Sequence, residues 1–248
     1  MPFSLRNFDL HEMLRCVLDL RGLIQGANSM EEASREIVRY LRESLVDPVT
    51  NTPECPLVRF YKTHAYGGLE PELQEFAGQR MEGSTPRAKM KCLVLLATAG
   101  AEPEWNSRRE SCGHQAIPLP SRKIVERAPM IAELIRQMGL DIDSVVAPRP
   151  ELLRKMEERT YNVFFVPEAK GSPFIPAQAE FVDPYRIRSV VGFGGLLLTG
   201  ELYAVILFST VRVPPEAADR FRNIALELRI GISAFGVDRT FDPEMVTE

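Results

Sequence analysis

The spacing of hydrophobic residues changes several times along the chain, and each change marks a predicted element. Two apolar runs, 187–198 and 202–210, flank a short segment that contains Gly200, which is typical of a β-hairpin. After Pro214 the apolar residues recur at steps of three and four, which predicts one amphipathic helix. Its buried face is expected to carry Ala218, Phe221, Ala225, Leu228, Ile232 and Phe235.

The same helical spacing predicts two helices at the N-terminal end. The first spans 10–25, with a proposed apolar face of Leu10, Met13, Leu14, Val17, Leu18 and Ile24. The second begins at Ser29 and ends before Asp47, with Ala33, Ile37, Leu41 and Leu45 on one side. Ser29 followed by Glu32 predicts a capping box, in which each residue satisfies a backbone amide group of the other.

The middle of the chain alternates between strand and helix patterns. Strand 91–98 has no polar alternation, so we expect it to be covered on both faces. The other predicted elements are a strand at 57–62, a short helix at 71–80, a helix at 121–138 that Pro129 kinks or splits, a helix at 150–158, and an aromatic and proline-rich loop at 160–186. The glycines at 192–195 predict a bulge or a close backbone approach within the sheet.

These elements predict an α+β fold with one central antiparallel sheet. The N-terminal and C-terminal helices pack together on one face, and an insertion of loop and helix covers the other. The expected organisation is N-terminal helices of the same domain at 1–46, the main domain at 47–240 with inserted helices at 121–159, and a tail at 241–248.

Composition narrows the class of protein. The hydrophobic content of 45% is ordinary for a soluble globular chain, and a net charge of −4 disfavours general nucleic-acid binding. Neither a signal peptide nor a membrane-spanning segment is predicted. Cys16 and Cys92 lie in apolar periodic segments, where free cysteines behave as small buried hydrophobes. We therefore expect a reduced, cytoplasmic protein.

Two blocks of the sequence resemble the GAF domain, a small-molecule sensor of bacterial signalling proteins. One is the helix pair 14–45 leading into strand 57–61; the other is the hairpin and final helix at 187–235, with Gly200 and 202–206 at its centre. The resemblance implies a GAF-like fold, with a PAS-like fold as the alternative, and a pocket between the sheet and its covering loops. The implied ligand and cofactor are unknown. Bilin-binding relatives have Cys followed directly by His, whereas this chain has Cys112-Gly113-His114.

Cys112 and His114 are the most specific candidate for a chemical site among residues that are close in sequence. On a strand, residues two apart project to the same face, so the thiol and the imidazole would share a metal or a proton. Core packing of the cysteine and a backbone hydrogen bond to the histidine explain the pair as well. Two ligands are too few for a closed zinc site.

The aromatic loop supplies a second set of candidates. An apolar pocket cover with a few polar groups is one interpretation, and core packing on the sheet is the other. Arg188, at the start of the hairpin, is a candidate for holding a carboxylate or phosphate, or lies on a solvated strand edge. The predicted ligand-binding residues are Cys112, His114, Trp105, Tyr161, Phe164, Phe165, Phe174, Tyr185 and Arg188, with no catalytic residue and no metal ligand.

Three functional hypotheses follow. The first is a non-catalytic sensor that binds a small molecule, forms a homodimer through its terminal helices, and relays its state to an output domain or partner protein. The second is a cysteine-based redox enzyme or redox sensor that uses Cys112 and His114. The third is a structural dimerisation module whose pocket its own side chains fill.

Overall fold

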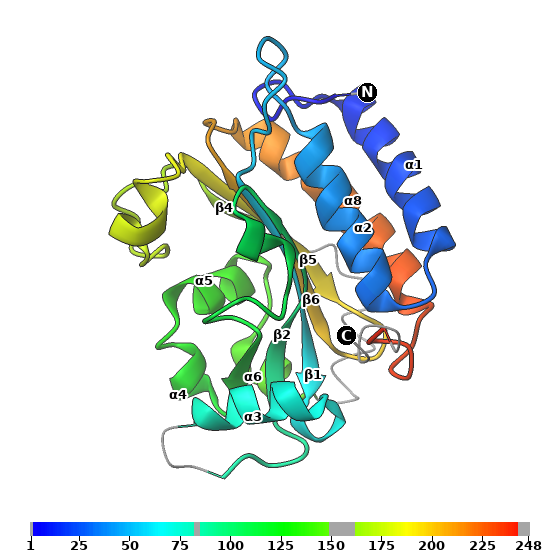
Figure 1. The fold of residues 1–248 in the computed structure, drawn as a ribbon, viewed down its shortest axis with the longest axis vertical. Coiled ribbons are helices and arrows are strands. Elements are labelled where there is room, and N and C mark those ends of the chain that lie inside the picture. The colour runs from blue at the N-terminus through cyan, green and yellow to red at the C-terminus, as the bar shows by residue number, and fades with distance from the viewer. Residues whose placement is uncertain (1, 82–84, 149–161, 243–248) are drawn as a thin grey trace.

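The computed structural model describes residues 2–81, 85–148 and 162–242, and it forms a single sheet between two helical layers (Figure 1). The sheet has six strands in the order β3-β2-β1-β6-β5-β4, and every neighbouring pair is antiparallel. The strands are β1 (Leu57–Ala65), β2 (Lys91–Gly100), β3 (Ala116–Leu119), β4 (Phe164–Val166), β5 (Ser189–Leu196) and β6 (Leu202–Ser209). The predicted α+β class with an antiparallel sheet is confirmed.

Long helices cover one face of the sheet and short ones cover the other. On the right of Figure 1 lie α1 (Leu10–Gly26), α2 (Met30–Ser44) and α8 (Pro215–Ser233). On the left lie α4 (Arg122–Val125), α5 (Pro129–Gln137) and α6 (Ile142–Val146), while α3 (Pro71–Gln79) packs beside β3. Three further turns of helix are η1 (Tyr66–Gly68), η2 (Pro103–Asn106) and η3 (Gln178–Val182).

The C-terminal hairpin and helix form as their pattern predicts. All six residues expected on the buried face of the last helix are buried. Between β5 and β6 the strands approach closely at Gly194, where an added Cβ would lie 2.1 Å from the carbonyl oxygen of Tyr203. Gly200 has a φ of +87° in the turn, a conformation that glycine adopts without steric cost. The close backbone approach expected for this glycine-rich segment is confirmed.

The prediction for the apolar face of α1 is wrong in part. Leu10, Leu14 and Leu18 are 59%, 52% and 62% exposed, while the buried residues of α1 are Met13, Cys16, Leu20 and Ile24. Both sets recur at helical spacing, so the helix has two apolar stripes. Only one of them packs on the rest of the protein.

The helix ends also differ from prediction. Ser29 caps α2 and accepts a hydrogen bond from the amide of Glu32 at 3.0 Å, but the Glu32 carboxylate accepts from the amide of Asn28 instead of Ser29. Two amides of the first turn of α2 donate to the carbonyl oxygens of Arg239 and Thr240, so the segment after α8 returns to this helix start. The complete capping box is at α1, between Asp9 and Glu12.

The middle of the chain holds most of the missed elements. The split at Pro129 is confirmed, because α4 ends at Val125 and α5 begins at that proline. β1 extends to Ala65, beyond the predicted strand, and β3 and α6 were not predicted. The segment 160–186 is not a loop throughout, since it contains β4 and η3. The predicted helix at 150–158 lies outside the described residues.

None of the helices in the described part of the chain combines the length and the apolar character needed to cross a bilayer.

Candidate functional site

A large cleft lies on the face of the sheet opposite α1, α2 and α8. Its volume is about 1370 Å³, and its walls come from both the sheet and the segments that cover it. The sheet contributes residues of four strands, β1, β2, β3 and β6, including Leu57, Leu93, Ile117, Ala204 and Ile206. The helices α4 and α5 and the segment 175–181 form the opposite wall. A mostly apolar concave surface of this kind suits a small organic ligand.

Polar side chains gather at one part of this cleft. Arg59 projects from the middle of β1 and donates a hydrogen bond to the hydroxyl of Tyr61 at 3.3 Å. Arg80, just after α3, donates to the carbonyl oxygen of Cys112 at 3.0 Å, and its guanidinium lies 3.5 Å from the ring centre of Phe76. Both arginines line the cleft, and their positive charges favour an anionic group at this part of it.

His114 lies at the rim of the cleft beside the two arginines. Burial, together with the positive charges of Arg59 and Arg80, lowers the pKa of the imidazole to about 4. The residue as a whole is nevertheless exposed. His114 is therefore neutral at pH 7 and offers a hydrogen-bond donor or acceptor without adding charge.

Trp105 forms another part of the wall. Its ring packs against Tyr185 and Phe181, with ring centres 4.5 and 5.6 Å away. The turn that carries it is held to β2, because Thr98 donates a hydrogen bond to the carbonyl oxygen of Trp105. Gly100 makes this approach possible, since an added Cβ would lie 2.4 Å from Cβ of Trp105.

Of the predicted ligand-binding residues that the structure describes, Trp105 and His114 line this cleft. Phe164 and Phe165 lie in β4, where Phe164 is fully buried as core, and Phe174 packs on the same core layer. Tyr185 does not line the cleft but packs against Trp105 and Phe181, which do. Arg188 lies in a separate small cleft with Arg186, and Tyr161 lies outside the described residues.

The geometry expected for Cys112 and His114 is wrong. Residues 112–114 form a turn before β3 begins at Ala116, so the strand alternation that would align the two side chains does not apply. The thiol of Cys112 is exposed and donates to the carbonyl oxygen of Glu110 at 3.7 Å. Across the described ranges, no group of three His, Cys, Asp or Glu residues is arranged to hold a metal ion.

The other three cysteines are free and buried, and burial raises the pKa of each thiol, to about 12 for Cys16 and Cys92. For Cys16 and Cys92, the predicted burial is confirmed. A redox cycle that forms a disulfide needs a second accessible thiol, and this chain supplies none beside Cys112.

Sequence reasoning missed Arg59, Tyr61 and Arg80. A signal for Arg59 was present, because it is a charged residue inside the otherwise apolar run Leu57–Phe60 of a strand covered on both faces. A charged group at such a position needs a partner or a cavity. Arg80 carries no such signal, since a helix end is an ordinary place for an arginine.

No protein-family model and no curated protein sequence matches the chain. Solved structures do. Free methionine-R-sulfoxide reductase from Neisseria meningitidis, solved in complex with its substrate, is 11% identical with a TM-score of 0.51, covering 91% of this chain and 90% of its own. The GAF domain of a phosphoenolpyruvate-protein phosphotransferase (ptsP) from Coxiella burnetii is 12% identical with a TM-score of 0.47, covering 90% and 93%.

A phycocyanobilin-bound GAF domain of a cyanobacterial phytochrome is also similar, with 12% identity, a TM-score of 0.43, and coverage of 92% and 98%. Similarity at these identities concerns the fold alone. The fold of this chain is GAF-like, as the helix pair and the C-terminal hairpin predicted.

Proposed function

We propose that this chain is a sensor that binds a small molecule in the large cleft and transmits the bound state through α1 and α8. The observation that carries the proposal is a mostly apolar cleft of about 1370 Å³ that has the charged side chains of Arg59 and Arg80 in its wall. A ligand with an apolar body and one anionic group would satisfy both features.

The strands connect the cleft to the terminal helices. Ala204 and Ile206 of β6 face the cleft, while Tyr203 between these strand positions donates a hydrogen bond from its hydroxyl to the carbonyl oxygen of Ala225 in α8. A ligand that moves β6 therefore acts on α8 through this buried hydrogen bond. Ligand binding shifts such an equilibrium only by its differential affinity for the two arrangements.

The terminal helices carry the surface for a second copy of this chain. Of the eight large apolar side chains that are exposed in the described chain, five lie on two helices: Leu10, Leu14 and Leu18 on α1, and Leu226 and Ile230 on α8. The helices are neighbours, joined by a hydrogen-bonded ion pair between Arg21 and Glu227 at 2.6 Å. We place the homodimer interface on this combined apolar stripe, because a two-fold axis pairs identical surfaces.

The ligand proposal is tested with 1-anilinonaphthalene-8-sulfonate, a dye with an aromatic body and one sulfonate. Trp105 is the single tryptophan of the chain and lines the cleft, so energy transfer from its fluorescence reports binding there. We expect saturable binding, weakened about tenfold or more in Arg59→Gln, which loses a charged hydrogen-bond donor. Ile117→Phe, which adds volume inside the cleft, should weaken it as well.

Arg39→Gln is the matched control, since Arg39 is an exposed arginine of α2 paired with Glu36, away from the cleft. Equal affinity of the wild type, Arg59→Gln and Ile117→Phe would place the dye elsewhere and contradict the proposal.

A further inference from the structure

A second cleft, separate from the first, is lined almost entirely by arginine. Its volume is about 470 Å³, and its lining residues are Arg6, Arg186, Arg188, Thr210 and Arg212. They come from three segments that are distant in sequence: the N-terminal segment, the link into β5, and the link out of β6. None of them lines the large cleft. We call this feature the arginine cleft.

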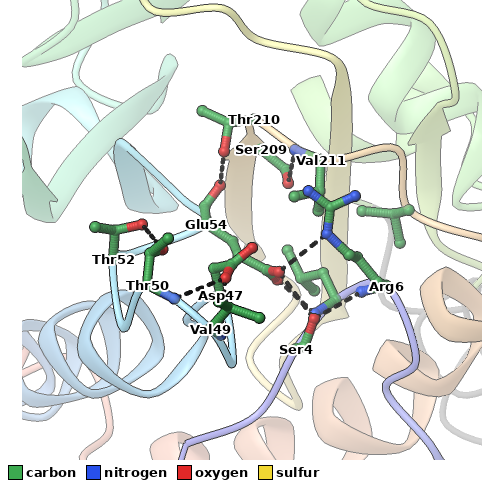
Figure 2. A network of polar contacts seen from close by, with 12 residues as sticks. Ser4, Arg6, Asp47, Val49, Thr50, Thr52, Glu54, Ser209, Thr210 and Val211 are labelled. Atoms are coloured by element: carbon green, nitrogen blue, oxygen red, sulfur yellow. Dashed lines mark hydrogen bonds and ion pairs between the residues drawn. The ribbon is translucent and has the colours of Figure 1, made fainter.

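Two of the arginines are positioned by carboxylates. Nε of Arg6 lies 3.7 Å from Oε1 of Glu54, as Figure 2 shows, and Nη2 of Arg212 lies 2.7 Å from Oε2 of Glu168. Glu54 is 1% exposed, and its carboxylate also accepts hydrogen bonds from the hydroxyl of Ser4 and the amide of Leu5. Because the Glu54 carboxylate already has these three partners, it is poorly placed to balance the charge of the other arginines.

Thr210 is tied to the same glutamate. Its amide and its hydroxyl both donate to the backbone carbonyl oxygen of Glu54, at 2.8 and 3.1 Å (Figure 2). The N-terminal segment, the segment before β1 and the end of β6 are therefore held together beneath the guanidinium groups. A rigid base of this kind keeps the positive charges in place without a ligand.

The other two arginines have no such partners. Within the described ranges, the side chains of Arg186 and Arg188 make neither an ion pair nor a hydrogen bond, and both are exposed. Arg186 has a φ of +54°, the left-handed region that is unfavourable for a residue with a Cβ. The backbone of Arg188 is fixed on both sides, to Ser209 and to Ala169.

The charges of this cleft do not cancel. Four guanidinium groups face two carboxylates, those of Glu54 and Glu168, so two positive charges remain in a chain whose net charge is −4. Like charges held close together destabilise the protein unless an anion joins them. Two excess charges match a dianion.

We propose that the arginine cleft binds a small molecule that carries a phosphate monoester. The planar fork of arginine donates two parallel hydrogen bonds to phosphate oxygens, and a phosphate monoester supplies about two negative charges at neutral pH. A carboxylate would balance only one of the two excess charges. The volume suits a small ligand, and the cleft is too local to follow the backbone of a nucleic acid.

The test is isothermal titration calorimetry of methyl phosphate, which has no apolar body to suit the large cleft, at low salt in a phosphate-free buffer, with methyl sulfate as the monoanionic analogue. We expect one site with a dissociation constant below about 1 mM and weaker binding of methyl sulfate. Arg186→Gln combined with Arg188→Gln should weaken methyl phosphate at least about tenfold. Arg39→Gln should leave it unchanged, because Arg39 does not line this cleft.

Several results would overturn the proposal: no saturable heat, equal affinity in the double variant, or equal affinity for methyl sulfate. Tighter binding of a hexaglutamate peptide than of methyl phosphate would also overturn it and assign the cleft to an acidic protein segment. Both substituted arginines are exposed, so a melting temperature within a few degrees of the wild type verifies folding. Arg188→Gln alone, with an expected smaller loss of affinity, provides a second variant.

Discussion

The two faces of the sheet are built from the same strands, yet one face is tightly packed and the other leaves a large cleft. In β6, Tyr203, Val205 and Leu207 face the long helices, and Ala204 and Ile206 face the large cleft. On the helix face, Phe221 packs between Phe8 and Phe193, with both ring centres 5.1 Å away. The helix face is filled, whereas the other face leaves a volume of about 1370 Å³.

The length of the covering helices explains this difference. Three helices of 15 to 19 residues lie across one face and present continuous rows of side chains to it. The other face is covered by α4 and α5, which have 4 and 9 residues and are separated before Pro129. Short, interrupted helices do not cover a sheet face completely. An apolar sheet face can therefore line an open cleft.

Shortening one aromatic residue on each face should produce the largest difference. Phe221→Ala removes a fully buried ring from the filled face and should lower the free energy of unfolding by about 3–5 kcal/mol. Phe181→Ala removes a half-buried ring from the cleft wall, where no new enclosed cavity forms, and should cost about 1–2 kcal/mol. Urea unfolding with unchanged slopes measures both. Equal losses would show that the cleft face is as tightly packed as the helix face.

The buried basic pair His64 and Lys62 should make the stability of the fold depend on pH. His64 is 5% exposed and Lys62 is 1% exposed; Nε2 of His64 lies 3.1 Å from the carbonyl oxygen of Gly68, and Nδ1 lies 3.3 Å from Nζ of Lys62. Nε2 therefore carries the proton of a neutral imidazole, and Nδ1 accepts from the lysine. Burial and the lysine charge lower the pKa of His64 to about 4.

Because the unfolded chain binds this proton near pH 6.5 and the folded chain only near pH 4, stability falls as the pH falls between these values. The loss from His64 should reach up to about 3 kcal/mol. His64→Gln removes this proton uptake, so the drop in melting temperature from pH 6.5 to pH 4 should shrink. Exposed His11→Gln is the control. The same acid-induced drop in His64→Gln and the wild type would contradict the assignment.

The outer stripe of α1 and α8 should matter least for folding and most for assembly. Leu14→Glu changes the free energy of unfolding of the subunit by about 0.5 kcal/mol or less, since the side chain is exposed. We expect light scattering to show a dimer for the wild type and a monomer for Leu14→Glu. Leu198→Glu, equally apolar and exposed but located in the hairpin turn, should remain dimeric. A monomeric wild type would end the dimer proposal.

Hydrophobic periodicity predicted some elements correctly and others wrongly, because it reports only the spacing of apolar residues. Periodicity correctly identified the last helix and the C-terminal hairpin, because burial on one side repeats at a fixed spacing. It failed for α1, where Leu10, Leu14 and Leu18 repeat as regularly as the buried residues but face outward. β4 has only three residues, which is too short for any period to register.

The candidate site was harder to predict than the fold. Trp105 and His114 both line the large cleft, but His114 does so beside Arg59 and Arg80, which come from β1 and from the end of α3. Arg188 joins Arg6 and Arg212 in the arginine cleft only because the N-terminal segment and both ends of the hairpin meet there. A pattern of neighbouring residues in the sequence does not show which distant segments of the chain meet in space.

The sequence by itself determined the class of fold, the hairpin with its closing helix, and the burial of Cys16 and Cys92, because these depend on local spacing and hydropathy. Only the tertiary structure decided which apolar stripe of α1 is covered and which face of the sheet stays hollow. It also decided which four arginines gather in one small cleft that contains fewer carboxylates than guanidinium groups. Those outcomes depend on how segments far apart in the chain pack against one another, and hydropathy along the chain does not encode how completely one surface fills another.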